Sequence, residues 1–181
     1  MGPPPNGSPY GPDWPLRMTE VLFLDLETTG LRPDRRGGIT EIALLDQQRV
    51  RLYWAGTPPH PHPSPRTLDA TLRMLDGHVV VGHNIRFDLH HLTHEAHRLD
   101  LPGPTLCTID TLGLARQLGV PSMDYTLGAL LDYFDAPSEG PLHTAHVDAA
   151  ATRTLFWQLV AYGNLTTLSD AGAQPVRWAN S

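Results

Sequence analysis

The stretch 21–31, VLFLDLETTGL, joins an apolar run to two acids and a turn. A β-strand points alternate side chains to the same face, so we expect Asp25 and Glu27 to lie together, beside the face that carries Val21 and Phe23. Neighbouring carboxylates strongly disfavour ionising together unless they share a proton or a cation. A hard divalent cation would stabilise the pair. The alternative interpretation is a solvated strand end that the sequence TTG turns.

The composition is that of one globular, mildly acidic domain. The chain has 181 residues, of which 40% are hydrophobic and 18% are charged, and its net charge is -6. That length suits a single domain with a sizeable core. A protein that binds nucleic acid by neutralising many phosphates is expected to be basic. Any role with nucleic acid would therefore depend on a local site or on bound metal ions.

The number of cysteines and the hydropathy of the sequence indicate the cellular compartment. The single cysteine, Cys107, excludes an internal disulfide and a cysteine-rich zinc site, which favours a reducing compartment. The N-terminus lacks the charged start and apolar core of a secretory signal, and no apolar run reaches the roughly 18 residues of a membrane span. The sequence therefore predicts a cytoplasmic protein without a membrane partner.

Three parts are expected along the chain. Residues 1–18 are rich in proline and predict a disordered lead, because proline enters neither helix interiors nor central strands. Residues 19–163 carry regular hydrophobic patterns and predict the folded domain. Residues 164–181 show no clear period and are expected to form a C-terminal tail.

The patterns in residues 19–163 predict a mixed sheet with helices packed against it. Apolar or alternating runs with short links predict three neighbouring antiparallel strands, at 20–27, 39–46 and 49–56. A strand at 78–84 followed by a helix at 85–100 implies a parallel neighbour, and 105–110 is a further expected strand. The other expected helices cover 67–77, 111–119, 126–134 and 146–163.

Further chemistry-bearing residues fall near the same end of the predicted sheet. Asp88 lies one turn into the helix after strand 78–84, and open α/β sheets gather ligands at the carboxyl ends of their strands. His143 would sit at or just before the last helix, with Asp148 in its first turns. Each residue has an ordinary alternative, because acids are favoured in first helical turns and a histidine is often a surface residue.

Three motifs follow one another in order, DLETTG at 25–30, HNIRFD at 83–88 and HTAHVDA at 143–149. Together they resemble the DnaQ-like, or DEDDh, family of 3′-to-5′ exonucleases, which includes the proofreading epsilon subunit of bacterial DNA polymerase III. The resemblance covers roughly residues 20–162 and makes 19–163 the expected exonuclease domain. It implies a ribonuclease H-like α/β fold, a mixed sheet of about five strands, three antiparallel and then parallel, flanked by α-helices.

The resemblance also implies a metal-dependent site. Its four carboxylates would hold two divalent cations, Mg²⁺ or Mn²⁺, since oxygen ligands favour these ions; they are Asp25, Glu27, Asp88 and Asp148. Two such ions about 4 Å apart would clamp the scissile phosphate. His143 would be the general base, ahead of its neighbour His146, because it is the first histidine of the third motif.

The same resemblance implies contacts with the terminal nucleotide. The backbone of Thr28, Thr29 and Gly30 would approach it closely, and Leu31 would wedge against its base. Asn84 and Phe87 would also touch the substrate. The alternatives are a plain hairpin turn for the first group, and a capping asparagine and a packed phenylalanine for the second.

Two sequence features lie outside this pattern. His90, His94 and His97 share one helical side, but a solvated histidine-rich face is expected there because the H-E-x-x-H spacing of zinc peptidases is absent. The segment 54–67 is short and proline-rich where relatives commonly carry a longer segment over the substrate. The resemblance therefore assigns no residues that contact the penultimate nucleotides.

The expected activity is hydrolysis of terminal phosphodiesters at single-stranded or frayed 3′ ends of DNA, releasing nucleoside 5′-monophosphates in proofreading or DNA repair. A DNA polymerase subunit is an expected partner if the chain serves a replicase. Two alternatives stay open. An RNA-trimming, oligoribonuclease-like enzyme is disfavoured because that group tends to carry H-R-A-x-x-D-I. A non-catalytic, polymerase-associated binding module is disfavoured because no motif acid has been lost.

Overall fold

A six-stranded mixed sheet forms the centre of the computed structural model, which describes residues 10–33, 37–59, 61–176 and 178. The strands are β1 (Val21–Thr28), β2 (Ile39–Leu45), β3 (Val50–Ala55), β4 (Val79–Gly82), β5 (Leu106–Asp110) and β6 (Gln174–Val176). Their order across the sheet is β3-β2-β1-β4-β5-β6. The first three strands are antiparallel, β4 and β5 run parallel to β1, and β6 is antiparallel to β5. The predicted mixed α/β sheet is confirmed, with one strand more than expected.

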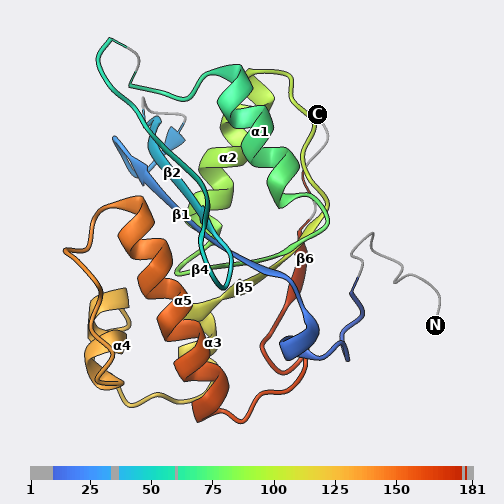
Figure 1. Cartoon of the computed structure of the whole chain (residues 1–181), viewed down its shortest axis with the longest axis vertical. Coiled ribbons are helices and arrows are strands. Elements are labelled where there is room, and N and C mark those ends of the chain that lie inside the picture. Colours follow the sequence, from blue (N-terminus) through green and yellow to red (C-terminus); the bar gives the residue numbers. More distant parts are fainter. Residues whose placement is uncertain (1–9, 34–36, 60, 177, 179–181) are drawn as a thin grey trace.

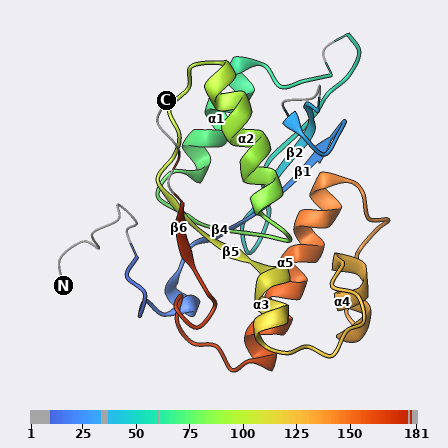
Figure 2. The same cartoon turned by 180° about the vertical axis from the view of Figure 1, so that it is seen from behind.

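Helices cover both faces of the sheet (Figures 1 and 2). They are α1 (Pro65–Leu75), α2 (Arg86–Arg98), α3 (Thr111–Gln117), α4 (Leu127–Tyr133) and α5 (Ala145–Tyr162), after a 3-10 turn η1 (Leu16–Met18). α1 and α2 lie on one face, and α3, α4 and α5 lie on the other. Within the described part of the chain, no helix is both long and apolar enough to cross a lipid bilayer.

β1 runs through the middle of the core and explains the long apolar run in its sequence. Phe23 and Leu24 are both fully buried, one on each face. Phe23 packs against Phe156 of α5, with 6.0 Å between ring centroids. A strand covered on both faces is expected to be apolar at nearly every position. The acids at its end therefore stand where the buried part of the strand stops.

The C-terminal tail contributes the strand that the sequence analysis missed. β6 pairs with β5, with Pro175 opposite Cys107. Leu168 and Ala171, in the loop before β6, are 2% and 1% exposed. A three-residue edge strand that contains a proline has almost no sequence signal, because proline normally argues against a strand.

Part of the proline-rich lead is also packed against the domain. The disorder expected for 1–18 stays a prediction for residues 1–9, which lie outside the described residues. In the remainder, Leu16 is only 3% exposed, and its N–H donates to the carbonyl oxygen of Thr166 at 3.0 Å. The N–H of Leu168 donates to the carbonyl oxygen of Trp14 at 3.0 Å. These backbone bonds to the tail, which the sequence pattern does not reveal, order the end of the lead.

Candidate active site

Three carboxylates converge where β1 ends and α5 begins. Asp25 and Glu27 project from the face of β1 that packs on α5, and Asp148 lies in the first turn of α5. One oxygen from each of these acids lies within 4.8 Å of the others, and each residue is partly buried. The alternation of β1 and the packing of Phe23 on α5 bring them together. Three acids that the sequence analysis selected from two distant motifs thus share one site.

Asp88 lies beside this group but is not part of it. Its side chain is buried in the first turn of α2, and its Oδ1 accepts a hydrogen bond from the N–H of Leu26 at 3.0 Å. β4 pairs with β1 only from Val21 to Phe23, so Leu26 lies beyond the strand pairing on that side. Asp88 pairs with this buried N–H of β1, which β4 does not reach, and its charge acts on Asp25.

The crowding of these acids raises their pKa values. Burial, followed by the charges of Asp88 and Asp148, raises the pKa of Asp25. Burial also raises the pKa of Asp88, although the N–H of Leu26 offsets part of the effect. Burial and the charge of Asp148 raise the pKa of Glu27. Carboxylates this close disfavour ionising together, so a bound cation would stabilise their charged forms.

The backbone of His143 is hydrogen-bonded to one of these acids, Asp148. Its N–H donates to both carboxylate oxygens of Asp148, at 3.1 and 3.3 Å, and its side chain is exposed. His143 also has a φ of 78°, a left-handed conformation that is uncommon for a residue other than glycine and that clusters at functional sites. The rival base, His146, packs edge-on against the ring of Tyr53, with 5.0 Å between centroids.

The turn after β1 is held by hydrogen bonds at its base. The strand register shifts between Glu27 and Thr28, and the hydroxyl of Thr28 donates to the carbonyl oxygen of Gly30 at 3.0 Å. The N–H of Thr29 donates to the carbonyl oxygen of Gly38 at 3.0 Å, and the hydroxyl oxygen of Thr29 accepts from the N–H of Gly38 at 2.9 Å. Leu31 is 84% exposed at this turn. An apolar side chain is therefore presented to solvent in the turn that follows β1.

Asn84 and Phe87 lie at the start of α2 in different environments. Asn84 is exposed, has a φ of 59°, and its N–H donates to Oδ1 of Asp110 at 2.8 Å. The N-cap of α2 is Ile85 and carries no side-chain capping bond, so the alternative capping role of Asn84 is not what the structure shows. Phe87 is partly buried and packs on the ring of His91, with 4.7 Å between centroids.

Glu41 is a fifth acid that the sequence analysis missed. It lies on β2 directly opposite Glu27, and its charge raises the pKa values of Glu27 and Asp148. Its Oε2 accepts hydrogen bonds from the N–H of Ala145 at 3.1 Å and from the hydroxyl of Tyr53 at 3.3 Å. Glu41 belongs to none of the three motifs, and only the register of the β1–β2 hairpin could have placed it beside Glu27.

The histidine-rich face of α2 does not form a second centre. Among the residues that the structure describes, Asp25, Glu27 and Asp148 form the one group of three or more side chains placed to hold a metal ion. His90 is exposed on α2, and its neighbour His91 is fully buried.

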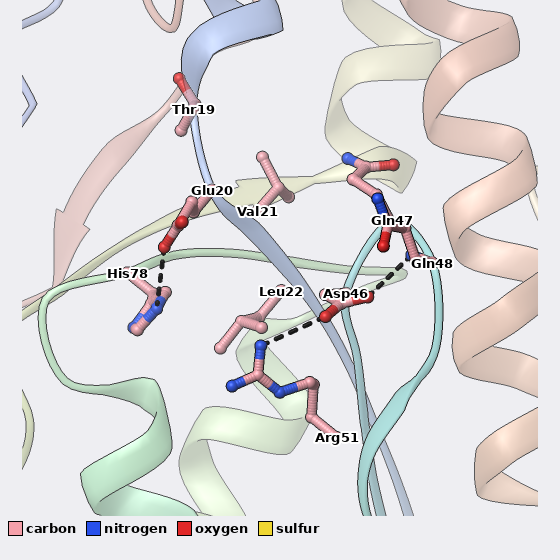
Figure 3. Close-up of a pocket in the computed structure, with 9 residues that line it drawn as sticks. All are labelled: Thr19, Glu20, Val21, Leu22, Asp46, Gln47, Gln48, Arg51 and His78. Atoms are coloured by element: carbon pink, nitrogen blue, oxygen red, sulfur yellow. Dashed lines mark hydrogen bonds and ion pairs between the residues drawn. The ribbon is translucent and has the colours of Figure 1, made fainter.

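A pocket with a volume of about 250 Å³ lies at the other end of β1 (Figure 3). Its lining residues belong to none of the three motifs; they are Thr19, Glu20, Val21, Leu22, Asp46, Gln47, Gln48, Arg51 and His78. Its polar side chains pair with one another, with 3.2 Å between Arg51 and Asp46 and 3.9 Å between His78 and Glu20. The acids of the candidate site therefore lie outside this pocket.

Comparison with known families assigns the chain. A family model described as exonuclease, of the RNase T type, matches residues 60–156, more than half of the sequence. The chain belongs to this exonuclease family. The match includes Asp88, His143 and Asp148 but begins after Asp25 and Glu27. The structure brings these two acids of the first motif together with Asp148. No curated protein matched the chain in a comparison of whole proteins.

Solved structures share the fold of this family member. Exonuclease X in complex with 5′ overhanging duplex DNA is 24% identical, with 84% of this chain and 98% of that chain covered and a TM-score of 0.61. The family B DNA polymerase of Pyrobaculum calidifontis is 16% identical, with 84% and 27% covered and a TM-score of 0.61. Cell-death related nuclease 4 is 15% identical, with 80% and 64% covered and a TM-score of 0.60. The predicted ribonuclease H-like exonuclease fold is confirmed.

Proposed function

We propose that the chain is a metal-dependent 3′-to-5′ exonuclease of the histidine type that removes nucleoside 5′-monophosphates from single-stranded or frayed 3′ ends of DNA. The observation that carries the proposal is the group of carboxylates Asp25, Glu27 and Asp148, with oxygens within 4.8 Å of one another. Membership of the exonuclease family supports the reaction class. The hydrogen bonds from the N–H of His143 to Asp148 support His143 as the candidate base.

The acids fit a site for two divalent cations. The donors are all carboxylate oxygens, which suit Mg²⁺ and Mn²⁺. Burial, followed by the charges of Asp88 and Asp148, raises the pKa of Asp25, so a bound cation would stabilise its carboxylate. Asp25, Glu27 and Asp148 would hold the ions with the help of Asp88, and bound ions would supply positive charge against the scissile phosphate. Pop2p of S. pombe, which has been solved in an Mg²⁺- and Mn²⁺-bound form, shares the fold at 12% identity and a TM-score of 0.54.

The remaining groups position the substrate and accept the proton. The exposed ring of His143 would take a proton from the water that attacks the terminal phosphodiester, a task that suits an imidazole near neutral pH. Its backbone tie to Asp148 keeps that ring close to the acids. The backbone of Thr28, Thr29 and Gly30 would support the terminal nucleotide, with Leu31 against its base. Asn84 and Phe87, at the start of α2, would extend this surface.

DNA is the proposed substrate, and proofreading or DNA repair is the proposed setting. The third motif, HTAHVDA, departs from the oligoribonuclease pattern, and the structure of Exonuclease X contains duplex DNA. A structure of NrnC from Brucella melitensis, 17% identical with a TM-score of 0.54, contains pGG, so RNA substrates belong in the test. A polymerase partner and a cytoplasmic location are parts of the proposal that rest on the sequence alone.

The test is degradation of a 5′-labelled single-stranded DNA and of its RNA equivalent, with Mg²⁺, Mn²⁺ or EDTA. Wild type is expected to give ladders of single-nucleotide steps on DNA that disappear with EDTA. Asp25→Asn should abolish the ladder. A preference for short RNA would replace the DNA proposal with an RNA-trimming enzyme, and a lack of cleavage with either metal would leave a binding module.

A further inference from the structure

Glu41 joins three elements at the edge of the candidate site. It lies on β2, and its Oε2 accepts from the hydroxyl of Tyr53 on β3 at 3.3 Å and from the N–H of Ala145, the first residue of α5, at 3.1 Å. Glu41 and Ala145 are 104 positions apart in the sequence. The three-carboxylate group does not include Glu41, so this acid has another task.

The start of α5 lacks a local cap, and Glu41 supplies one. The first N–H groups of a helix have no partner within the helix. At α5 the N-cap is Thr144, whose side chain makes no capping bond, and Ala145 is fully buried, so water does not reach its amide. A carboxylate oxygen there satisfies the amide. Glu41 is therefore the hydrogen-bond partner of the first amide of α5.

The position of this amide also sets that of the residues on either side of Ala145. His143 precedes it, and the N–H of His143 donates to Asp148 in the first turn of α5. Tyr53, the second partner of Glu41, packs against the ring of His146 at 5.0 Å between centroids. The segment 143–148 is thus held from outside the helix by the two neighbouring strands.

The charge of Glu41 is repelled by that of Glu27, and the hydrogen bond to the amide of Ala145 explains why an acid stands there nonetheless. Its carboxylate stands opposite Glu27 in the strand register. A like charge opposite another is unfavourable in a sheet. A neutral apolar residue at this position would avoid the repulsion but would leave the amide of Ala145 unpaired, at a cost comparable to a lost hydrogen bond.

We propose that Glu41 is a positioning residue: its hydrogen bond to the amide of Ala145 holds the start of α5 so that His143 and Asp148 meet Asp25 and Glu27. The inference rests on the proposed exonuclease function and deepens it. Glu41 acts through the reach of its side chain rather than through its charge, and this separates it from a metal ligand.

Two conservative substitutions test the length of the Glu41 side chain and its charge separately. Glu41→Gln keeps the reach and an acceptor oxygen but removes the charge, whereas Glu41→Asp keeps the charge and shortens the side chain by one methylene group. Kinetic constants on single-stranded DNA and amide hydrogen exchange at Ala145 are measured for both variants. Glu20→Gln and Glu20→Asp are the matched controls, because the side chain of Glu20 is 85% exposed at the far end of β1.

Glu41→Asp is expected to lower kcat by about 10- to 100-fold, because small displacements of catalytic groups are costly, while KM changes by less than about threefold. Exchange at Ala145 should accelerate in the same variant. Glu41→Gln should retain kcat within about fivefold of wild type and keep the amide of Ala145 protected. The Glu20 variants should match wild type in both measurements.

Three results would overturn the positioning role: a larger kcat loss in Glu41→Gln than in Glu41→Asp, wild-type kcat in Glu41→Asp, or unchanged exchange at Ala145 in Glu41→Asp. The first would identify Glu41 as a charged participant at the metal site. A wild-type chain without nuclease activity would instead remove the proposed function. Exchange at Ala145 would then decide alone whether Glu41 holds the start of α5.

Discussion

His143 combines an exposed imidazole with a strained backbone. Its φ of 78° is a conformation that costs residues other than glycine about 1–3 kcal/mol. The hydrogen bonds from its N–H to Asp148 offset part of that cost. Asparagine tolerates this conformation better than most residues, and it lacks a group that titrates near neutral pH. Replacing His143 by asparagine therefore removes the candidate base with little disturbance of the backbone.

We expect His143→Asn to lower kcat by about 10²- to 10⁴-fold, the usual contribution of a general base, while Tm stays within about 2 °C of wild type. Nuclease assays with Mg²⁺ and thermal unfolding of the same preparation measure the two effects. His146→Asn is the control and should keep most of the activity. Equal losses in the two variants would contradict the assignment of the base.

The charge of Asp25 is unfavourable in the absence of a cation. Burial and four neighbouring acids raise its pKa, so Asp25→Asn should stabilise the metal-free chain by about 1 kcal/mol, which is about 2–4 °C in Tm for a domain of this size. The same variant should lose the stabilisation that Mn²⁺ gives to wild type. Thermal unfolding with EDTA and with Mn²⁺ measures both effects.

Asp46→Asn is the matched control for this measurement. Backbone N–H groups and Arg51 lower the pKa of Asp46, so removing its charge should not raise Tm. A metal-free Asp25→Asn variant that is less stable than wild type would show that the charge of Asp25 is already compensated within the protein.

The turn 166–170 joins the C-terminal segment to the lead. The carboxylate of Asp170 accepts hydrogen bonds from the N–H groups of Thr166 and Thr167, at 3.0 and 2.9 Å. These bonds lower the pKa of Asp170 to about 2. The carbonyl oxygen of Thr166 in turn accepts from the N–H of Leu16. The charge of one exposed acid thus helps to order a contact between the two ends of the domain.

The pH dependence of this turn follows from the lowered pKa. An aspartate in an unfolded chain has a pKa of about 3.9, so the carboxylate stabilises the fold fully above about pH 4, and the effect is lost as the pH falls through the folded value near 2. Asp170→Asn should therefore unfold at a lower urea concentration than wild type at pH 6. The difference should shrink at pH 3, and a difference that stays constant would contradict the prediction.

We expect the stability of the whole domain to depend on its C-terminal tail. The predicted boundary at residue 163 would remove β6 and the buried side chains of Leu168 and Ala171. Loss of one buried leucine alone costs about 2–5 kcal/mol. A chain that ends at Gly163 should therefore melt about 5–15 °C below the full chain, as measured by thermal unfolding. An unchanged Tm would support the boundary that the sequence pattern suggests.

The sequence was informative where the pattern is local. The alternation in 21–31 predicted that Asp25 and Glu27 share a face, and the periodic segments predicted the principal strands and helices. The structure places both acids together and adds Asp148 to them. The three-residue strand β6 and the buried Leu16 were missed, because each depends on a distant partner rather than on its own neighbours.

Local pattern determines which residues of this chain form strands and helices and which carry the acids, because side-chain periodicity is a property of neighbouring residues. Tertiary structure decides which groups meet. Strand register placed Glu41 opposite Glu27. The pairing of β4 with β1 stops at Phe23, so the N–H of Leu26 donates to Asp88 instead. Hydrogen bonds and charge interactions act over a few ångströms in space, whatever the separation along the chain. A bond such as that between Glu41 and Ala145 therefore exists only once the whole sheet and α5 have packed.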